Sequence, residues 1–537
     1  MTKRRRPKRI ELGIEELTQI VDRAAPALEA ADLAKLKAAV NTLGFLTQEL
    51  ETKGTSIQRL RNWLFGAKTG TTRRVLGQGA PRGGGRQGQR KRKKRKGHGR
   101  NGAAAYRGAE HVQVAHGSLR HKDACPDCAK GKVYTQSAPA VLVRVQGMAP
   151  LRATVYEMDR LRCHLCGKVF TAQTPAGLGA EKYDETAASM VGLLKYGAGL
   201  PFYRLQQLEQ DLGIPLPAAT QWEVVDRAAG LLRPAYEELI LQAAQGELLH
   251  NDDTTMKILD FTDEARAEAL PGAGAETRTG IFTSGIVSVT GDRRIALFAT
   301  GPKHAGENLA AVLAHRAAER SPPIQMCDAL SRNTAGEFET IVASCLAHTR
   351  RRYVEVATSF PEPCRYVLET LREVYRTDAR AVGLSPEERL RLHQEESGPR
   401  MKKLEKWLRE QIDQHLVEPN SGLGEAIGYM RKHWEELTLF LRTAGAPLDN
   451  NLCERALKKA ILHRKNALFF KTENGARVGD IFMSLIHTAE LCEANPFDYL
   501  VALQRHTGAV ERDPAAWMPW NYTEALACLA TDADLPS

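Results

Sequence analysis

The sequence contains no run of about 20 uncharged apolar residues, which is the length that a membrane-spanning helix requires. Six of the first nine residues are lysine or arginine, but no apolar segment follows them, so the start does not resemble a secretory signal. Cysteine is also scarce: the 537 residues include ten, of which only four lie in close pairs. So few thiols cannot build a disulfide framework in a chain of this length. These absences predict a soluble protein of the reducing cytoplasm that has no membrane partner.

Acidic residues are scarce at one end of the chain. The first 100 residues carry 25 lysines and arginines against 8 acids, which more than accounts for the net charge of +11. Residues 69–110 are rich in Gly, Gln and cations, with too little apolar surface to fold. They include seven consecutive basic residues: Arg90, Lys91, Arg92, Lys93, Lys94, Arg95 and Lys96. We predict a disordered basic arm that binds nucleic-acid phosphates; the alternative is a solvated charge run or a localisation signal.

Residues 1–68 contain a heptad repeat of apolar side chains, interrupted at Lys53-Gly54. One apolar position of the heptad is occupied by Leu36, Leu43, Leu50, Ile57 and Leu64, and the other, three residues later, by Ala39, Leu46 and Leu60. This spacing predicts a helical interaction region. The pattern is compatible both with a coiled coil that self-associates and with an amphipathic helix that packs on its own domain.

Four cysteines form two Cys-x-x-Cys pairs within residues 111–180. The pairs are Cys125 with Cys128 and Cys163 with Cys166. Four thiolates on two turns supply the closed tetrahedral shell that structural Zn²⁺ prefers. The β-type residues at 141–145 and 153–156 predict strands between the pairs. We therefore predict a zinc ribbon; since the spacer is long, buried cysteines without metal or a redox pair remain alternatives.

Residues 181–245 are predicted to be helical, because apolar side chains recur at helical spacing on both sides of a break at Gly213-Ile-Pro. Two helices that flank a short Gly/Pro turn could form a helix-turn-helix that enters the major groove of DNA. A helical connector that packs only against neighbouring elements fits the pattern equally well.

Residues 246–384 are predicted to contain three strands, a helix and a fourth strand. The first strand, within 247–259, ends or bends at an acidic pair, and a hairpin turn at Gly291-Asp292 joins the next two. The helix is expected over 308–319 and the fourth strand over 323–328. The order of these elements decides where their carboxylates can meet.

Asp252 lies in the first strand and Asp328 ends the fourth. If these strands are neighbours, the two carboxylates share one edge of the sheet and can hold divalent cations such as Mg²⁺, which suits phosphoryl transfer. Taken singly, an aspartate at a strand end is more often a turn or cap residue. Asp253 adjoins Asp252, and the sequence leaves the choice between them open.

A third carboxylate, Glu454, lies in the first turns of a helix that Asp449 or Asn450 can cap. This helix belongs to residues 446–512. A salt-bridged surface helix is the ordinary interpretation of such a segment. The charged residues 385–445 before it are predicted to form a helical insertion, and residues 513–537 after it form a tail with no evident role.

Several motifs together resemble the IS66 insertion-sequence family of bacterial transposases. They are Leu60-Arg-Asn-Trp-Leu-Phe-Gly66, His250-Asn-Asp-Asp-Thr254, Cys327-Asp-Ala-Leu-Ser-Arg-Asn333, Cys345-Leu-Ala-His-Thr-Arg-Arg-Arg352, Asp449-Asn-Asn-Leu-Cys-Glu-Arg-Ala456 and Arg464-Lys-Asn466. The resemblance spans nearly the whole chain. It implies a multidomain α+β protein with a ribonuclease-H-like catalytic core, interrupted by the helical insertion, and the activity of a DDE transposase.

The resemblance also implies roles for individual residues. Asp252, Asp328 and Glu454 would be the catalytic triad that holds two Mg²⁺ or Mn²⁺ ions, although many family members have Glu where this chain has Asp253. Further cations would contact DNA phosphates: Arg455, Lys458, Arg464 and Lys465. His250 and His348 could orient metal ligands or touch the scissile phosphate, although a structural histidine is the more ordinary interpretation of each.

The implied partners are transposon-end and target DNA, a second copy of the chain in a synaptic complex, and small helper proteins from the same element. The implied location is the bacterial nucleoid. Two other functions remain compatible with the residues. One is a zinc-containing DNA-binding regulator or inactive transposase relic. The other is a ribonuclease-H-like nuclease that cleaves DNA without strand transfer.

Overall fold

The computed structural model describes residues 14–37, 39–41 and 112–533, with gaps in the last range. The gaps are 129, 137–141, 143, 146–147, 163, 165–167, 177–178, 180 and 271–277. Residues 1–80 and 153–537 form one compact unit, and residues 81–152 form a second. The basic arm, most of the heptad repeat, and Cys163 with Cys166 lie outside the described residues. Of the helices described, none has the length and apolar character that crossing a bilayer demands.

The described N-terminal residues are helical, as the sequence predicts. They form α1 (Ile14–Ala24), η1 (Ala25–Ala27) and further helical residues at 30–37 and 39–41. In the smaller unit, an isolated β-bridge joins Ala124 to Lys132.

The strands predicted at 141–145 and 153–156 are wrong for the described residues of these ranges, none of which lies in a strand. Leu142 and Val155 are instead largely exposed. The hairpin in this part of the chain lies later. Its strands are β1 (Arg160–Arg162) and β2 (Val169–Thr171), which pair antiparallel around the second cysteine pair.

Four helical segments precede the sheet. They are α4 (Glu185–Gly192), the π-helix η3 (Leu193–Gly197), α5 (Phe202–Asp211) and α6 (Ala218–Ala243). The predicted break between α5 and α6 is confirmed, and Gly213 adopts a φ of +80° there. Leu232 and Leu239 of α6 are fully buried, and α6 packs against α4, α16 and α17. This packing is what the connector interpretation requires; a helix-turn-helix role stays a prediction.

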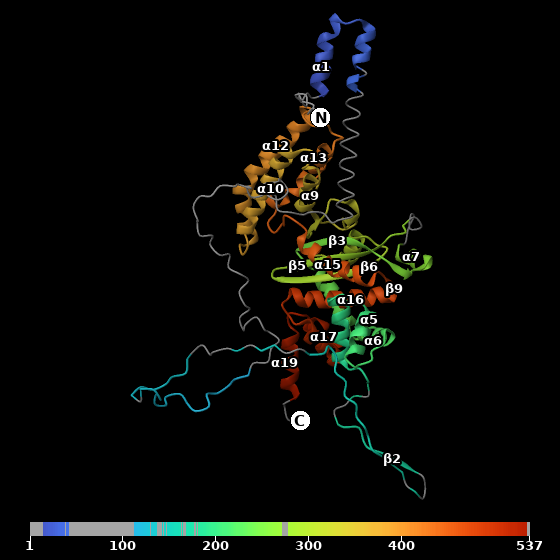
Figure 1. Ribbon diagram of the computed structural model, residues 1–537, viewed down its shortest axis with the longest axis vertical. Coiled ribbons are helices and arrows are strands. Elements are labelled where there is room, and N and C mark those ends of the chain that lie inside the picture. Colours follow the sequence, from blue (N-terminus) through green and yellow to red (C-terminus); the bar gives the residue numbers. More distant parts are fainter. Residues whose placement is uncertain are drawn as a thin grey trace, which may run out of the picture. The chain divides into compact units, whose positions relative to one another are not determined.

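A five-stranded mixed sheet lies at the centre of the larger unit, with spatial order β6-β5-β3-β7-β8 (Figure 1). The strands are β3 (Leu248–Met256), β5 (Ile281–Thr290), β6 (Arg293–Gly301), β7 (Ile324–Cys327) and β8 (Ile341–Ser344). The first three are antiparallel, whereas β3, β7 and β8 are parallel. The predicted hairpin turn at Gly291-Asp292 is confirmed, since Thr290 pairs with Arg293. A shorter parallel pair joins β4 (Ile258–Asp260) to β9 (Phe470–Thr472).

Two short helices lie among these strands. The first, α7 (Asp263–Ala269), follows β4. The second, α8 (Ala305–Leu313), is the helix predicted over 308–319, and it begins and ends earlier than expected. It begins at His304 in a capping box, in which the Glu307 side chain accepts the His304 backbone N–H. The capping box therefore fixes the start of α8.

The free edge of strand β6 is covered by helix α16 (Glu473–Leu491). Three α16 side chains one helical turn apart accept backbone N–H groups from alternate residues of β6. Asp480 accepts from Thr300, Ser484 from Phe298 and Thr488 from Ala296. Side chains one helical turn apart on α16 therefore match the spacing of alternate residues along β6. These contacts provide acceptors for backbone N–H groups that would be unpaired on an uncovered edge strand.

The predicted insertion is helical and extends a larger helical body above the sheet in Figure 1. The body consists of α9 (Leu346–Val356), α10 (Pro361–Arg380), α11 (Pro386–Leu392), η6 (His393–Ser397), α12 (Gly398–Asp413), α13 (Gly422–Lys432), α14 (Trp434–Leu437) and η7 (Leu439–Leu441). Its core joins Leu371 of α10, Leu404 of α12 and Ile427 of α13 to Met326 of β7. The helical body is therefore anchored on the strand that precedes Asp328.

The remaining helices follow this body. They are α15 (Asn451–Ala467), α17 (Pro496–Arg505), α18 (Thr507–Arg512), η8 (Pro514–Trp517) and α19 (Tyr522–Ala533). The predicted tail, 513–537, folds back in part. Trp517 is buried and its carbonyl accepts the Tyr499 hydroxyl at 3.1 Å. This part of the tail therefore belongs to the packed structure.

Candidate active site

Asp252 and Asp328 lie on adjacent parallel strands. The register pairs Leu248 with Ile324 and His250 with Met326. Two residues further along the same register, Asp252 lies level with Asp328, which directly follows β7. Of the two expectations for this strand, that it ends at the acidic pair is wrong, because β3 continues to Met256 through its pairing with β5. Only the parallel pairing of β3 with β7 stops before Asp252. These two strands can therefore separate beside the two carboxylates.

Asp252 and Asp253 point to opposite faces of the sheet, because side chains alternate along a strand. Asp253 faces α8: its Oδ2 lies 2.9 Å from His304 Nδ1, and its Oδ1 lies 3.7 Å from Arg332. Only 4% of the Asp253 side chain is exposed. Asp253 is thus engaged by His304 and Arg332 on the α8 side, while Asp252 faces the opposite side of the sheet.

The side of the sheet that Asp252 faces is covered by α15, the helix that carries Glu454. Gly285 is the cross-strand partner of Asp252, and a Cβ at Gly285 would lie 3.0 Å from the Leu457 side chain. The Cys453 thiol contacts the Gly285 carbonyl at 3.2 Å. The absence of a side chain at Gly285 therefore lets α15 approach β5, with Glu454 in its first turn.

The start of α15 is held by Asn450, which is fully buried. Its Oδ1 lies 3.0 Å from His250 Nδ1, and its Nδ2 donates to the Asn251 carbonyl at 3.0 Å. Asn450 is the N-cap residue, but its side chain does not cap the helix. Asp449 does so in its place by accepting the Asn451 N–H at 3.1 Å. Asn450 instead fastens α15 to β3 beside Asp252.

Two neighbouring residues orient the Asp328 carboxylate. The Asn333 side-chain amide and the Leu330 backbone N–H both donate to Asp328 Oδ1. Asn333 is buried, and its carbonyl accepts the Asn251 side chain at 2.7 Å. The loop after β7 is thereby tied to β3, which holds Asp328 next to Asp252.

The electrostatics of the three carboxylates suit a cation site. Burial, together with the nearby negative charges of Asp328, Asp253 and Glu454, raises the pKa of Asp252 to about 7. Glu454 Oε1 is buried without a hydrogen-bond partner. Oxygen ligands of this kind are those that Mg²⁺ prefers. The three groups do not form a trio of ligand atoms within 4.8 Å of one another.

The raised pKa of Asp252 predicts a pH dependence of metal binding. Only the ionised carboxylate binds Mg²⁺, so protons compete below the pKa of about 7. We expect the apparent affinity for Mg²⁺ to fall by up to about tenfold per pH unit below that value and to level off above it. Calorimetric titration across this range tests the expectation. Asp480 also has a pKa of about 7 through burial, so Asp252→Asn serves as the comparison, and an unchanged pH dependence in that variant would contradict the assignment.

The four cations expected to contact DNA differ in their surroundings. Arg455, Lys458 and Lys465 are exposed on one face of α15. Arg464 is already engaged, because it donates to Thr254 Oγ1 at 3.0 Å and to Thr255 Oγ1 at 2.6 Å. It holds α15 against β3 and is less available to DNA than the sequence suggests.

The structure separates the roles of the two histidines. Burial lowers the pKa of His250 to about 4, so it is a neutral structural partner of Asn450. His348 lies closer to the acids: its Nε2 is 3.8 Å from Glu454 Oε1. Sequence reasoning missed Asn333 and Asn450 as buried supports, although both lie inside the motifs that carry the resemblance.

The first cysteine pair forms a compact turn. The Cys125 N–H donates to the Gly131 carbonyl at 2.8 Å. Hydrogen bonds from the backbone of Gly131 and Lys130 and from the side chain of Cys125 lower the pKa of Cys128. A thiolate favoured by backbone N–H groups is the form that binds Zn²⁺. These two residues therefore fit half of a zinc site.

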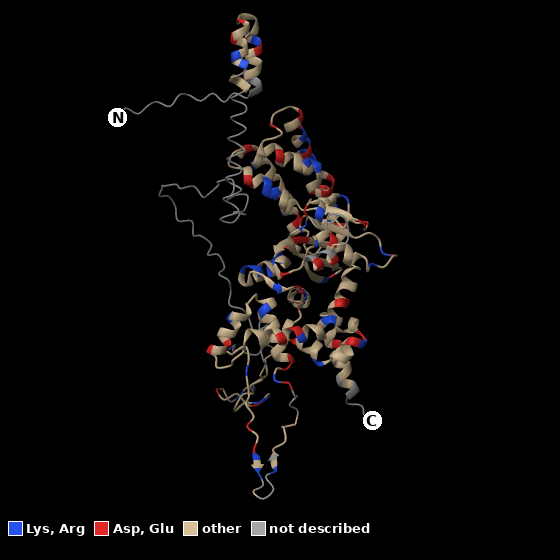
Figure 2. Ribbon diagram, turned by 90° about the vertical axis from the view of Figure 1, so that its right-hand side faces the viewer, with Lys and Arg blue, Asp and Glu red and all other residues tan. Residues whose placement is uncertain are grey.

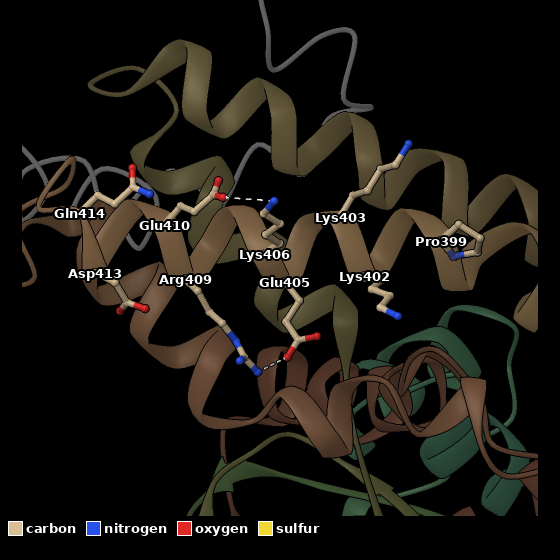
Figure 3. A pocket seen from close by; sticks show the side chains of 9 residues that line it. All are labelled: Pro399, Lys402, Lys403, Glu405, Lys406, Arg409, Glu410, Asp413 and Gln414. Atoms are coloured by element: carbon tan, nitrogen blue, oxygen red, sulfur yellow. Dashed lines mark hydrogen bonds and ion pairs between the residues drawn. The ribbon is translucent and has the colours of Figure 1, made fainter.

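Charged residues of both signs are distributed over the helical body (Figure 2). A shallow groove on the outer face of α12 is lined by such residues (Figure 3). Glu405 pairs with Arg409, and Lys406 with Glu410 at 3.8 Å. These pairs at helical spacing are typical of a solvated helix surface.

Comparisons with known proteins agree with this architecture. A family model described as "Transposase IS66 family" matches residues 182–478, from α4 to α16. Two relatives come from Sinorhizobium fredii (strain NBRC 101917 / NGR234). The uncharacterized protein y4jD is 28% identical over 383 residues, which cover 68% of this chain and 71% of the relative. The uncharacterized protein y4hP is 26% identical over 408 residues, which cover 70% of each. Because the family model spans more than half of the sequence, the chain belongs to the IS66 family of transposases.

Proposed function

We propose that this chain is a DDE-type transposase that cuts transposon ends and joins them to target DNA. The observation that carries the proposal is the placement of Asp252, Asp328 and Glu454 on one side of a β6-β5-β3-β7-β8 sheet. This strand order, with three antiparallel strands followed by two parallel ones, is that of a ribonuclease-H-like core. The three acids come from β3, the end of β7 and the start of α15.

Asp252 and Asp328 would hold a shared pair of Mg²⁺ or Mn²⁺ ions, and Glu454 would complete the shell of one of them. Such ions, when bound, activate the attacking oxygen and stabilise the leaving oxygen of an in-line displacement at a phosphodiester. The attacking group is first water and then the freed 3′-hydroxyl, so no covalent enzyme intermediate is needed. Asn333 and Asn450 would keep Asp328 and α15 in place during both steps.

Other parts of the chain would bind the nucleic acid and organise the complex. The basic arm, residues 90–96, supplies cations for non-specific phosphate contacts. Arg455, Lys458 and Lys465 form an exposed basic stripe in the helix that carries Glu454. Structural Zn²⁺ would be held by Cys125, Cys128, Cys163 and Cys166. A dimer that pairs two transposon ends, together with helper proteins of the same element, would complete the synaptic assembly.

Strand transfer is the activity that tests the proposal. The full chain is incubated with Mg²⁺, a target plasmid and linear DNA that carries the ends of its own element. We expect cleavage that exposes a 3′-hydroxyl at the element boundary, followed by joining of that end to the plasmid. Both products should disappear when a chelator removes the divalent cation.

The same assay separates the two alternative functions. A nuclease would cleave the ends without joining them to the plasmid. A DNA-binding regulator or inactive relic would retard the labelled ends in a gel but leave them intact with either Mg²⁺ or Mn²⁺. Either result would contradict the proposed strand transfer.

A further inference from the structure

A second group of potential metal ligands adjoins the acidic site. Cys345 directly follows β8 and is the N-cap residue of α9, and His348 lies in the first turn of that helix. Residues three apart in a helical turn share a face, so both side chains point toward the start of α15. Cys345 Sγ, a ring nitrogen of His348 and a carboxylate oxygen of Glu454 all lie within 4.8 Å of one another. No other trio in the described part of the chain is this compact.

One potential ligand atom in this group lacks a partner. Glu454 Oε1 is buried without a hydrogen bond, and buried polar atoms in native proteins are rarely left unsatisfied. His348 Nε2 lies 3.8 Å from Glu454 Oε1, which is too long for a hydrogen bond. It is close to the separation of about 3.4 Å between two ligands of one tetrahedral Zn²⁺ ion.

We propose that Cys345, His348 and Glu454 bind a transition-metal cation of the Zn²⁺ class. This cation inhibits the enzyme, because Glu454 is then no longer available to the pair of Mg²⁺ ions that the catalytic site holds. Thiolate and imidazole ligands favour Zn²⁺, whereas Mg²⁺ requires oxygen ligands. Binding releases the Cys345 thiol proton to solvent. The Asn450 N–H already donates to Cys345 Sγ at 3.2 Å, and such a hydrogen bond stabilises a metal-bound thiolate. The inhibitory part of this inference rests on the proposed function; the binding part does not.

The test compares the full chain with its Cys345→Ser variant. Serine retains an acceptor for the Asn450 N–H but removes the sulfur ligand. Co²⁺ is the probe for binding, because its bond to a thiolate gives a near-ultraviolet charge-transfer band. The paired cysteines contribute equally to both proteins, so the difference spectrum isolates Cys345. Cys528→Ser is the matched control, since Cys528 is exposed on α19 and is not part of the trio.

We expect the difference band in the comparison with Cys345→Ser and none in the comparison with Cys528→Ser. In cleavage assays with Mg²⁺, Zn²⁺ should inhibit the full chain, and Cys345→Ser should need at least about tenfold more Zn²⁺ for the same inhibition. His348→Gln provides a second variant with the same expected shifts, and far-ultraviolet circular dichroism shows whether each variant is folded.

Identical cobalt spectra for the full chain and both site variants would overturn the proposed site. Zn²⁺ inhibition that is equally strong in Cys345→Ser would place the inhibitory ion elsewhere and overturn the regulatory part. If the full chain fails to cleave DNA, the proposed function fails, but the cobalt difference still decides whether this trio binds metal.

Discussion

Replacing Asp252 with asparagine should reduce metal-dependent strand cleavage on the order of 10³-fold or more while DNA binding is retained. The large effect is expected because catalytic residues that act as one unit are not additive: the loss of a single member removes most of the rate enhancement that the whole unit provides. Asparagine matches aspartate in size but lacks the charge that attracts a divalent cation. The loss of one negative charge beside a polyanion should not weaken the complex with DNA. Single-turnover cleavage of labelled ends, with gel-shift binding of the same ends, measures both quantities.

The neighbouring residue provides the matched control. Asp253→Asn changes the same chemical group one position along β3, but on the face that packs against α8. This variant should lose about 1–3 kcal/mol of stability, because His304 and Arg332 lose a buried charged partner. It should retain most of its cleavage activity. If Asp253→Asn were inactive and Asp252→Asn active, the two assignments would be reversed.

The contrast between these two aspartates shows what the sequence could and could not predict. The alternation of side chains along a strand predicts that Asp252 and Asp253 face opposite sides. Which side carries the catalytic helix depends on contacts between residues about 170–200 positions apart, such as Cys453 with Gly285 and Asn450 with His250. No local pattern specifies such contacts, so only the family resemblance favoured Asp252 before the fold was known.

Local chemistry predicted other parts of the fold well. The Gly291-Asp292 turn was predictable because glycine accepts the positive φ, here +55°, at which the chain reverses. The spacer between the cysteine pairs was mispredicted, since β-type composition produces a strand only where a partner strand supplies hydrogen bonds. The family resemblance implies that Arg464 contacts DNA, and no local pattern in the sequence indicates another partner for it. Its threonine partners on β3 become visible only in three dimensions.

Asn450→Ala should destabilise the protein by about 2–4 kcal/mol and should greatly reduce cleavage. The estimate reflects two buried groups, His250 Nδ1 and the Asn251 carbonyl, that would each lose a hydrogen bond. Because Glu454 follows Asn450 by one helical turn, with its N–H bonded to the Asn450 carbonyl at 3.0 Å, loosening this junction should displace the catalytic carboxylate. Urea denaturation and amide hydrogen exchange in α15 measure the effect.

Asn451→Ala is the control within the same motif. Asn451 is exposed, and its side chain bonds only to Asp449 Oδ2, at 2.6 Å. Exposed substitutions of this kind usually change stability by about 0.5 kcal/mol or less. A difference between these two adjacent asparagines would show that α15 is held to β3 by the buried hydrogen bonds of Asn450, since Asn451→Ala leaves intact the backbone N–H that Asp449 accepts. Equal stability and equal exchange in the two variants would mean that apolar packing of Cys453 and Leu457 on Gly285 suffices to position Glu454.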